Sequence, residues 1–588
     1  MNAITLVIIA ALVLIIAYRY YGYFIATKVL MIDPDRETPA NKFNDGRDYV
    51  PTNKWVVFGH HFAAIAGAGP LIGPVLAAQF GYMPGYLWLL IGAVLGGGVH
   101  DMVILFASVR HDGKSLAEIA KEEVGRITGT ASSIAVLLIV ILSMAGLAIV
   151  IVNALYSNPW GTFTVAVTIP IAMFIGIYMR YIRPGKIGEA SAIGVILVLL
   201  GVVLGPAVKA SSLATYFTLN ETQLKLVLPA YGFLAATLPV WFLLAPRDYL
   251  SSYMKIGTIL VLALGIVLVR PTIAMPAVTK FASGGGPIIP GPLWPFLMIT
   301  IACGAISGFH ALISSGTTPK LIDNEKSIPM IGYGAMLAEC FVGVMALIAA
   351  TVLQPGDYFA INTSAAAFGK LQAAGYKIVN LPQLSQLVGE NIAHRPGGAV
   401  SLAVGMAYIF SRIPFLKYLM SYWYQFAIMF EALFILTTID AGTRVGRFIV
   451  QDIAGKVYKP LKRTDWWPGI IITSGLVSFA WGYLLFGGSI STIWPIFGVA
   501  NQLLATLALT IGTTIILKHS KKRSYALITL IPMLALLVTT VGAGTWSIFK
   551  TYIPKNMILN SFLMTIMIAI VIIVVVDSAS KWNKIIKD

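Results

Sequence analysis

Apolar segments long enough to cross a membrane recur along almost the whole chain. A transmembrane α-helix needs about 20 consecutive apolar residues. The polar stretches between these segments are too short to form a separate soluble domain. The sequence therefore predicts an all-α polytopic membrane protein with about 15 to 16 membrane segments. The fifteen predicted spans are 4–25, 55–80, 84–109, 129–156, 162–183, 186–207, 229–246, 252–270, 292–319, 328–354, 419–446, 467–487, 490–517, 524–545 and 557–578.

The composition agrees with this class and argues against several others. Hydrophobic residues make up 58% of the chain and charged residues 11%, whereas soluble domains carry about 25% charged residues. The net charge of +17 is spread over short loops between the spans, so we predict no nucleic-acid partner. Cys303 and Cys340 both fall inside predicted spans, which gives neither a disulfide framework nor a zinc spacing. We predict no cofactor, and the sequence does not assign a metal site.

The distribution of Lys and Arg predicts the orientation. Basic clusters lie at 180–186, 456–463, 518–523 and 581–587. With fifteen spans all four fall on one side, and the positive-inside rule identifies that side as the cytoplasm. The N-terminus is then outside and the C-terminus cytoplasmic. The apolar piece 397–410 is short for a span, and we predict a re-entrant or surface helix on the outer side.

An internal repeat is present as well. GHHFAAIAGAGP at 59–70 matches GFHALISSGTTP at 308–319 without a gap, in the pattern G-x-H-x5-G-x2-P. An odd number of spans separates the starts of the two copies, so they are antiparallel. Inverted repeats of this kind are typical of secondary transporters. The predicted division is 1–54 for the first span and its loop, 55–207 and 292–517 for two five-helix repeats, 208–291 for two inserted spans, and 518–588 for two final spans.

Glycine and proline inside a predicted span indicate a broken helix. The free N–H groups at such a break attract a carboxylate and the free carbonyls hold a cation, which makes it a binding site at the membrane midplane. The alternative is close helix packing by small residues. The residues predicted to bind substrate are His61, Gly67, Gly69, Pro70, His310, Gly316 and Thr317.

Ionisable and hydroxyl side chains inside spans are further candidates, because such groups are costly in a membrane and usually functional. We assign coupling of an ion or a proton to Ser314, Thr437, Thr438, Asp440, His100 and Asp101, and gating to Arg247 and Asp248. His60 and Glu431 also stand out. The alternatives are an inter-helix hydrogen bond for the histidines, an ion pair for Arg247–Asp248, and back-bonding within the helix for the threonines.

Three stretches carry a family resemblance: GHHFAAIAGAGPLIGPVLAAQ, LPVWFLLAPRDYL and TTIDAGTRVGRF. They resemble the carbon starvation protein CstA family, over nearly the whole chain. The resemblance implies a multi-pass transporter of the prokaryotic inner membrane, linked to uptake of peptides and, in some relatives, of pyruvate with protons. It also implies the LeuT-type five-plus-five inverted repeat of the amino acid–polyamine–organocation superfamily. On that fold, the breaks at Gly67–Pro70 and Gly316–Pro319 would hold the substrate, with Thr437 and Thr438 near a cation site.

Together these features predict a secondary active transporter that imports a small carboxylate or a short peptide by proton or sodium symport. No Walker A pattern and no H-E-x-x-H motif occur, so neither ATP-driven transport nor enzymatic activity is predicted. A channel and a membrane nutrient sensor stay open as alternatives. The choice between pyruvate, peptide and amino acid, the coupling ion and the oligomeric state also stay open.

Overall fold

The computed structural model describes residues 1–45, 48–373, 375–455, 457–463 and 466–587. Every regular element within these ranges is a helix, and two isolated β-bridges join Asn2 to Thr272 and Thr52 to Ile322. Lys456, from one of the basic clusters, lies outside the described residues. The chain is an all-α polytopic membrane protein, as the sequence predicts.

The first half of the chain contains thirteen α-helices, several of which continue into short π-helical turns. They are α1 (Ala3–Ile16), α2 (Pro39–Lys42), α3 (Lys54–Ile65), α4 (Gly69–Ala77), α5 (Tyr82–Gly92), α6 (Gly98–Arg110), α7 (Leu116–Glu123), α8 (Arg126–Leu155), α9 (Pro159–Ile177), α10 (Ile187–Lys209), α11 (Ala214–Phe217), α12 (Glu221–Thr237) and α13 (Leu244–Val269).

The second half contains the remaining twelve α-helices of the described chain. They are α14 (Leu293–Thr300), α15 (Phe309–Ser314), α16 (Ala335–Thr351), α17 (Pro355–Asn362), α18 (Ala365–Ala373), α19 (Leu381–Val388), α20 (Ala399–Ser411), α21 (Met420–Gly455), α22 (Trp467–Gly487), α23 (Ile490–His519), α24 (Leu527–Ser547) and α25 (Ile558–Lys587).

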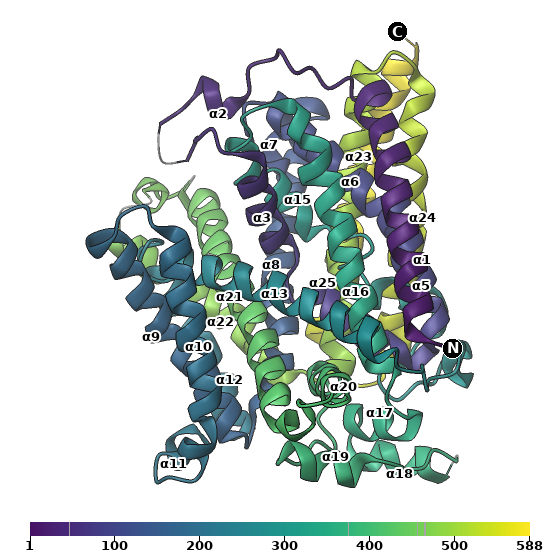
Figure 1. Ribbon diagram of the computed structural model, residues 1–588. Helices are drawn as coiled ribbons and strands as arrows, with labels where there is room; N and C mark the ends of the chain where they lie inside the picture. The colour runs from purple at the N-terminus through teal and green to yellow at the C-terminus, as the bar shows by residue number, and fades with distance from the viewer. Residues whose placement is uncertain (46–47, 374, 456, 464–465, 588) are drawn as a thin grey trace.

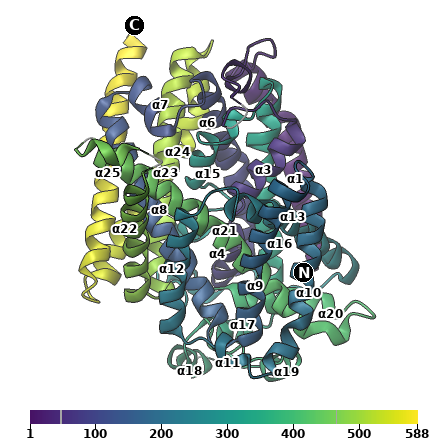
Figure 2. The same cartoon turned by 90° about the vertical axis from the view of Figure 1, so that its left-hand side faces the viewer.

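The long helices stand roughly parallel in one bundle (Figure 1). Among the described residues, twelve helices are long and apolar enough to cross a membrane, and the bent pair α3 and α4 makes up to thirteen. The C-terminus lies at one end of the bundle, whereas α11 and α17–α20 gather toward the other end, on the side of the N-terminus (Figures 1 and 2). Thirteen of the fifteen predicted spans coincide with these helices.

The other two predicted spans differ from the structure. The boundaries 229–246 are wrong, because α12 ends at Thr237 and α13 begins only at Leu244. Leu238 is extended, with φ −66° and ψ 152°, as expected for a residue that precedes proline. The segment 292–319 is not one helix but two short ones, α14 and α15, joined by the non-helical stretch 301–308.

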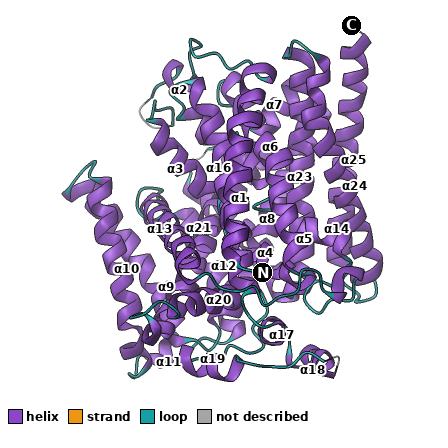
Figure 3. Ribbon diagram, turned by 45° about the vertical axis from the view of Figure 1, so that its right-hand side comes forward, coloured by secondary structure: helices purple, strands orange, loops and turns teal. Residues whose placement is uncertain are grey.

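The two broken helices run in opposite directions (Figures 2 and 3). α3 and α4 are bent by 46° at residues 66–68, where the sequence places Gly67. The break between α14 and α15 contains Gly304 at φ +84°, in the left-handed region that favours glycine. The two breaks touch, because a Cβ added to Gly69 would lie 2.4 Å from the Cys303 Sγ.

The structure corrects the predicted position of the second break. Gly316 and Thr317 lie beyond the end of α15, so the predicted break at Gly316–Pro319 is wrong. The predicted register of the repeat is wrong for the same reason, because His61 precedes its break in α3 whereas His310 follows its break in α15. The division into two five-helix repeats stays a prediction.

Shorter helices lie at both ends of the bundle. α20 is a short apolar helix at the predicted position, but it is buried against α16 and α21, so the alternative of a surface helix is wrong. At the other end, α7 follows α6 after a short turn. A capping box begins α7, because the Ser115 backbone N–H and hydroxyl both donate to the Glu118 carboxylate, which satisfies orphan groups at the helix start.

Candidate functional site

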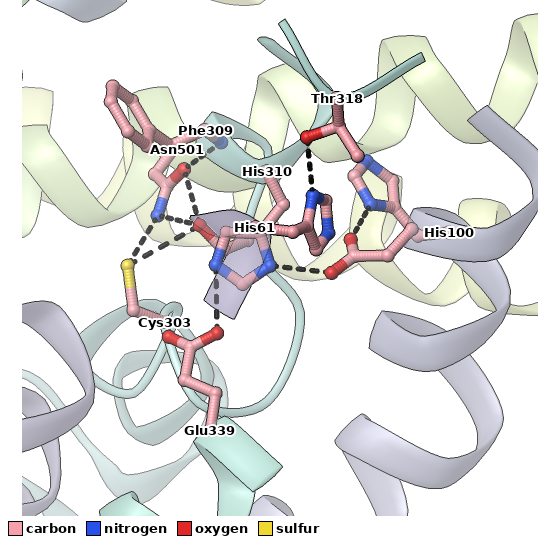
Figure 4. A network of polar contacts seen from close by, with 10 residues as sticks. His61, His100, Cys303, Phe309, His310, Thr318, Glu339 and Asn501 are labelled. Atoms are coloured by element: carbon pink, nitrogen blue, oxygen red, sulfur yellow. Dashed lines mark hydrogen bonds and ion pairs between the residues drawn. The ribbon is translucent and has the colours of Figure 1, made fainter. Parts of the chain in front are cut away.

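A buried imidazole lies between two buried carboxylates (Figure 4). His310 on α15 places its Nδ1 2.8 Å from the Asp101 Oδ2 on α6. Its Nε2 lies 3.0 Å from the Glu339 Oε2 on α16. All three side chains have zero exposure to solvent. We call His310, Asp101, Glu339 and the neighbouring His100 the histidine–carboxylate cluster.

His100 completes this cluster through its chain neighbour. The His100 Nδ1 lies 2.6 Å from the Asp101 Oδ1, and both side chains are fully buried. Asp101 therefore contacts an imidazole through each carboxylate oxygen. Such contacts compensate much of the cost of burying a charged group.

His61 lies beside the cluster and ties the first broken helix to the end of the second. Its Nδ1 lies 2.8 Å from the Thr318 hydroxyl, and the buried ring is close enough to Asp101 and His310 to interact with them electrostatically. The partly exposed His60 lies 3.3 Å from the Thr317 hydroxyl through its Nε2. Figure 4 shows His61 between Thr318 and His310.

Asn501 on α23 holds the second break. Its Oδ1 accepts a hydrogen bond from the Phe309 backbone N–H at 2.9 Å, which satisfies an orphan donor at the start of α15. The same side chain contacts the Ser307 hydroxyl at 3.2 Å and the Cys303 Sγ at 3.4 Å. The break is thus fixed by side chains rather than left to solvent.

A small pocket of about 70 Å³ lies beside the first break, between α3, α13, α15 and α21. Lys255 on α13 supplies its cationic group: the ammonium donates to the Ala63 carbonyl at 2.8 Å and lies 4.2 Å from the centre of the Phe434 ring. The other polar lining residues are His60, Asp248, Ser251, Ser252, Thr437 and Thr438.

A second buried charge cluster joins α12, α13 and α21. The Arg247 Nη1 lies 3.3 Å from the Asp440 Oδ2, and both side chains have zero exposure. The Tyr231 hydroxyl donates to the same Asp440 oxygen at 2.8 Å and also contacts the Arg247 guanidinium. Arg247 reaches the Thr168 hydroxyl on α9 through its other terminal nitrogen, at 3.3 Å. We call Arg247, Asp440 and Tyr231 the arginine–aspartate cluster.

The predicted site residues lie in several separate places. His61, His100, Asp101 and His310 meet in or beside the histidine–carboxylate cluster, while Gly67, Gly69 and Pro70 form the first break. Ser314 is buried at the end of α15, and its hydroxyl has no hydrogen-bond partner among the described residues. Gly316 and Thr317 lie beyond the end of α15, and the Thr317 hydroxyl contacts His60.

The residues assigned to a cation site do not lie together in the structure. Thr437 and Thr438 line the small pocket, although both hydroxyls also donate to the Phe434 carbonyl within α21. Asp440 instead pairs with Arg247. Arg247 therefore has its ion pair with α21 rather than with Asp248, which lines the pocket. The described residues contain no group of three or more His, Cys, Asp or Glu side chains that could hold a metal ion.

Sequence reasoning missed Glu339, Lys255 and Asn501. The first two could have been found, because they are charged residues inside the predicted spans 328–354 and 252–270 and meet the criterion that singled out Glu431. Glu431 itself is buried in α21, and neither of its carboxylate oxygens has a hydrogen-bond partner in the described part of the chain. Asn501 carries no comparable signal, because a lone amide in a span looks like an ordinary packing residue.

A further ionic cluster lies outside the spans, where α7 meets the ends of α6 and α23. The His111 Nε2 lies 2.8 Å from the Glu123 Oε1, and the Lys518 ammonium lies 2.6 Å from the Glu123 Oε2. The hydrogen bond to Glu123 raises the pKa of His111. The same bond, with the Lys518 contact, lowers the pKa of Glu123 to about 2.

Comparison with known proteins gives a family match over most of the chain. The sequence profile described as "Carbon starvation protein CstA" matches residues 2–543. The chain is 54% identical over 592 residues to the peptide transporter CstA of Bacillus subtilis (strain 168), covering 100% of this chain and 98% of the relative. It is 46% identical over 601 residues to the pyruvate/proton symporter BtsT of Escherichia coli (strain K12), covering 94% of this chain and 82% of the relative.

Solved structures give a more distant likeness. A manganese transporter of Eremococcus coleocola, in complex with an aromatic bis-isothiourea substituted compound, has a TM-score of 0.47 and 14% sequence identity. The superposition covers 92% of this chain and 98% of the other.

Proposed function

The chain belongs to the carbon starvation protein CstA family, and we propose that it is a secondary active transporter that imports a small carboxylate such as pyruvate, or a short peptide, by symport. Relatives of both names support this, since one is a peptide transporter and another a pyruvate/proton symporter. These relatives are transporters and not enzymes, and this chain is a transporter as well. The membrane in question is the plasma membrane of a prokaryote, with the end of the bundle that carries α7 and the C-terminus in the cytoplasm.

The pocket beside Lys255 is the observation that carries the proposal. The Lys255 ammonium has three N–H donors. One of them donates a hydrogen bond to the Ala63 carbonyl in the described structure. The others suit the carboxylate of a substrate, with the Ser251 hydroxyl, which has no hydrogen-bond partner among the described residues, as a further donor. A volume of about 70 Å³ compares with a water molecule's share of liquid of about 30 Å³. This space suits a pyruvate-sized anion better than a peptide, which would need the pocket to widen.

The two broken helices supply the moving parts. α3 and α15 both end on the pocket, and the breaks beside them touch at Gly69 and Cys303. We propose that the half-helices rock about these breaks, so that the pocket faces the outside and the cytoplasm in turn. Arg247, which bridges α13 and α21, would be one of the gating residues.

Uptake into proteoliposomes tests this function. We expect labelled pyruvate to accumulate under an inward proton or sodium gradient and not in its absence, and unlabelled di- and tripeptides to compete if they share the site. Flux that equilibrates without coupling to either gradient would contradict symport and support a channel. No flux of pyruvate or peptide at all would leave a nutrient sensor as the better account.

The pocket itself is tested by Lys255→Met. We expect this variant to lose binding of pyruvate, measured by isothermal titration on the purified protein. Lys225→Met is the matched control, because Lys225 is also a lysine with little exposure, lies on α12 and pairs with Glu221 at 2.7 Å outside the pocket. Equal loss of binding in both variants would contradict the pocket assignment.

A further inference from the structure

We propose that Glu339 is the residue that takes up and releases the transported proton, with His310 as the cation held beside it. The inference rests on the proposed function, since it names the coupling ion and its carrier. It would make the transport proton-coupled rather than sodium-coupled, which the sequence leaves open.

The charges of the trio formed by His310, Asp101 and Glu339 do not balance when both carboxyls are ionised and His100 is neutral. His310 contacts Asp101 at 2.8 Å and Glu339 at 3.0 Å, one through each ring nitrogen. A single imidazolium supplies one positive charge, while the two carboxylates supply two negative charges. An unbalanced charge with zero exposure is expensive, because water is absent and the local dielectric is low. One added proton makes this trio neutral.

The contacts indicate which carboxyl holds that proton. Asp101 has an imidazole at each oxygen, from His100 at 2.6 Å and from His310 at 2.8 Å. Glu339 has the longer approach of His310 at 3.0 Å and a contact with the Gly304 backbone, and neither of its oxygens has a well-oriented hydrogen bond to a described residue. Hydrogen bonds to the charged form favour ionisation. Asp101 is therefore the permanent anion and Glu339 the exchangeable site.

Other titratable groups lie in or near the cluster. His100 and Asp101 lie on α6, His310 on α15 and His61 on α3, while Cys340 is its chain neighbour on α16. Lys255 on α13 and Cys303 in the second break are close enough to interact with Glu339 electrostatically. Lys255 is the only one of these that is an amine, and it lies in the pocket where the substrate carboxylate would bind. A negative Glu339 and a substrate anion therefore compete for the same positive charge.

This competition couples the proton to the substrate. With Glu339 ionised, a second anion beside Lys255 is unfavourable, so substrate binding favours proton uptake and proton uptake favours binding, as reciprocal linkage requires. On release, the O–H bond of the Glu339 carboxyl breaks, the electron pair stays on the carboxylate oxygen and the proton passes to water on the cytoplasmic side. The change alters the contact between α16 and α15, which belongs to the second broken helix.

The packing connects the site to the moving parts. α16 packs against α3 and α4, and α15 packs against α3 and α6. Glu339 thus lies on a helix that contacts both halves of the first broken helix, while its partner His310 lies on the second. A change of charge at Glu339 acts directly on the junction between the two broken helices.

The test is the variant Glu339→Gln, which mimics a permanently protonated carboxyl. With one proton per substrate, an inward gradient of one pH unit supports about ten-fold accumulation. We expect the wild type to accumulate labelled pyruvate in this way with sodium absent on both sides. The variant should lose this accumulation and reach only the level found without a gradient. It should keep exchange of labelled for unlabelled pyruvate in preloaded vesicles, because exchange needs the fully loaded site alone.

Glu431→Gln is the matched control, because it also removes a fully buried glutamate from a membrane helix but touches neither cluster. We expect it to keep gradient-driven accumulation. Accumulation by Glu339→Gln at the wild-type level would overturn the proposal, as would wild-type uptake that requires sodium. If Glu339→Gln does not fold, two other measurements test the proposal. Wild-type uptake should not require sodium, and the variant Glu339→Asp should keep proton-driven uptake. Absence of any exchange or uptake in the wild type would instead contradict the proposed function.

Discussion

The two buried charge clusters differ in how their charges add up. In the arginine–aspartate cluster one guanidinium meets one carboxylate, and Tyr231 donates a further hydrogen bond to Asp440. In the histidine–carboxylate cluster the imidazole of His310 lies between two carboxylates, and a second imidazole, that of His100, contacts Asp101. A balanced pair has no need of another proton and suits a fixed clamp between helices. An unbalanced one is stable only when a proton is added, which suits an exchange site. The same burial thus gives two different behaviours.

The largest effect on stability should come from breaking the balanced cluster. Arg247→Ala leaves the Asp440 carboxylate buried without its cation, and removal of one partner of a buried ion pair costs about 3–5 kcal/mol. We expect a large drop in the thermal unfolding temperature of the purified protein. The double variant Arg247→Met with Asp440→Leu should recover much of this loss, because no uncompensated charge remains. A double variant as unstable as the single one would contradict a balanced clamp.

Asp101→Asn should have a smaller effect on stability. It weakens two contacts to imidazoles, and hydrogen bonds to charged groups are worth about 1.5–3 kcal/mol. The loss is limited because Glu339 can then ionise and pair with His310, so the cluster becomes balanced. We therefore expect moderate destabilisation in thermal unfolding together with loss of proton-driven accumulation. Normal proton-driven accumulation in this variant would show that Asp101 is not the permanent anion.

The ionic cluster outside the membrane should give a pH dependence. Because Glu123 raises the pKa of His111 in the folded protein, this contact stabilises fully below the unfolded pKa of about 6.5 and is lost as pH rises through the higher folded value. Glu123 stays ionised in this range, since its pKa is lowered to about 2. We expect the unfolding temperature to fall as the pH rises from about 6.5 through the raised folded pKa of His111, and to stop falling above it. His111→Ala should reduce this dependence of the unfolding temperature on pH. An unchanged pH dependence in the variant would show that a group other than His111 causes it.

The smallest effect should come from an exposed ion pair. Lys42 and Asp112 lie 3.0 Å apart, but their side chains are 49% and 48% exposed. Solvent-exposed pairs typically contribute less than about 1 kcal/mol. Lys42→Ala should therefore leave thermal unfolding and uptake close to wild type. A fall in unfolding temperature as large as that of Arg247→Ala would show that burial does not determine how much each ion pair contributes to stability.

The fold was largely predictable because its main signal is local. Apolar length alone predicts most of the spans, and Gly67 marks the first break because a membrane helix rarely carries that many small residues and prolines together. The boundary at Leu238 was missed although Pro239 provides a signal for it. The second break was misplaced because Gly316 and Pro319 look like stronger breakers than Cys303 and Gly304, whose conformation depends on the contact with Asn501 and with the first break.

The candidate site was predictable only in part. His61, His310, His100 and Asp101 are visible as ionisable residues in spans, and they do come together. Which of them pair is set by tertiary packing between α6, α15 and α16, which no local pattern records. Asp440 illustrates the limit: its sequence neighbours Thr437 and Thr438 suggest a cation site, yet the helix rotation turns it toward Arg247 instead.

Proton movement measured together with substrate movement tests the central claim most directly. Vesicles that contain the purified wild-type protein and a pH-sensitive dye start at equal pH on both sides and without sodium. Addition of pyruvate outside should acidify the lumen as labelled pyruvate enters, and Glu339→Gln should exchange pyruvate without acidification. Entry of pyruvate into wild-type vesicles without acidification of the lumen would contradict the account.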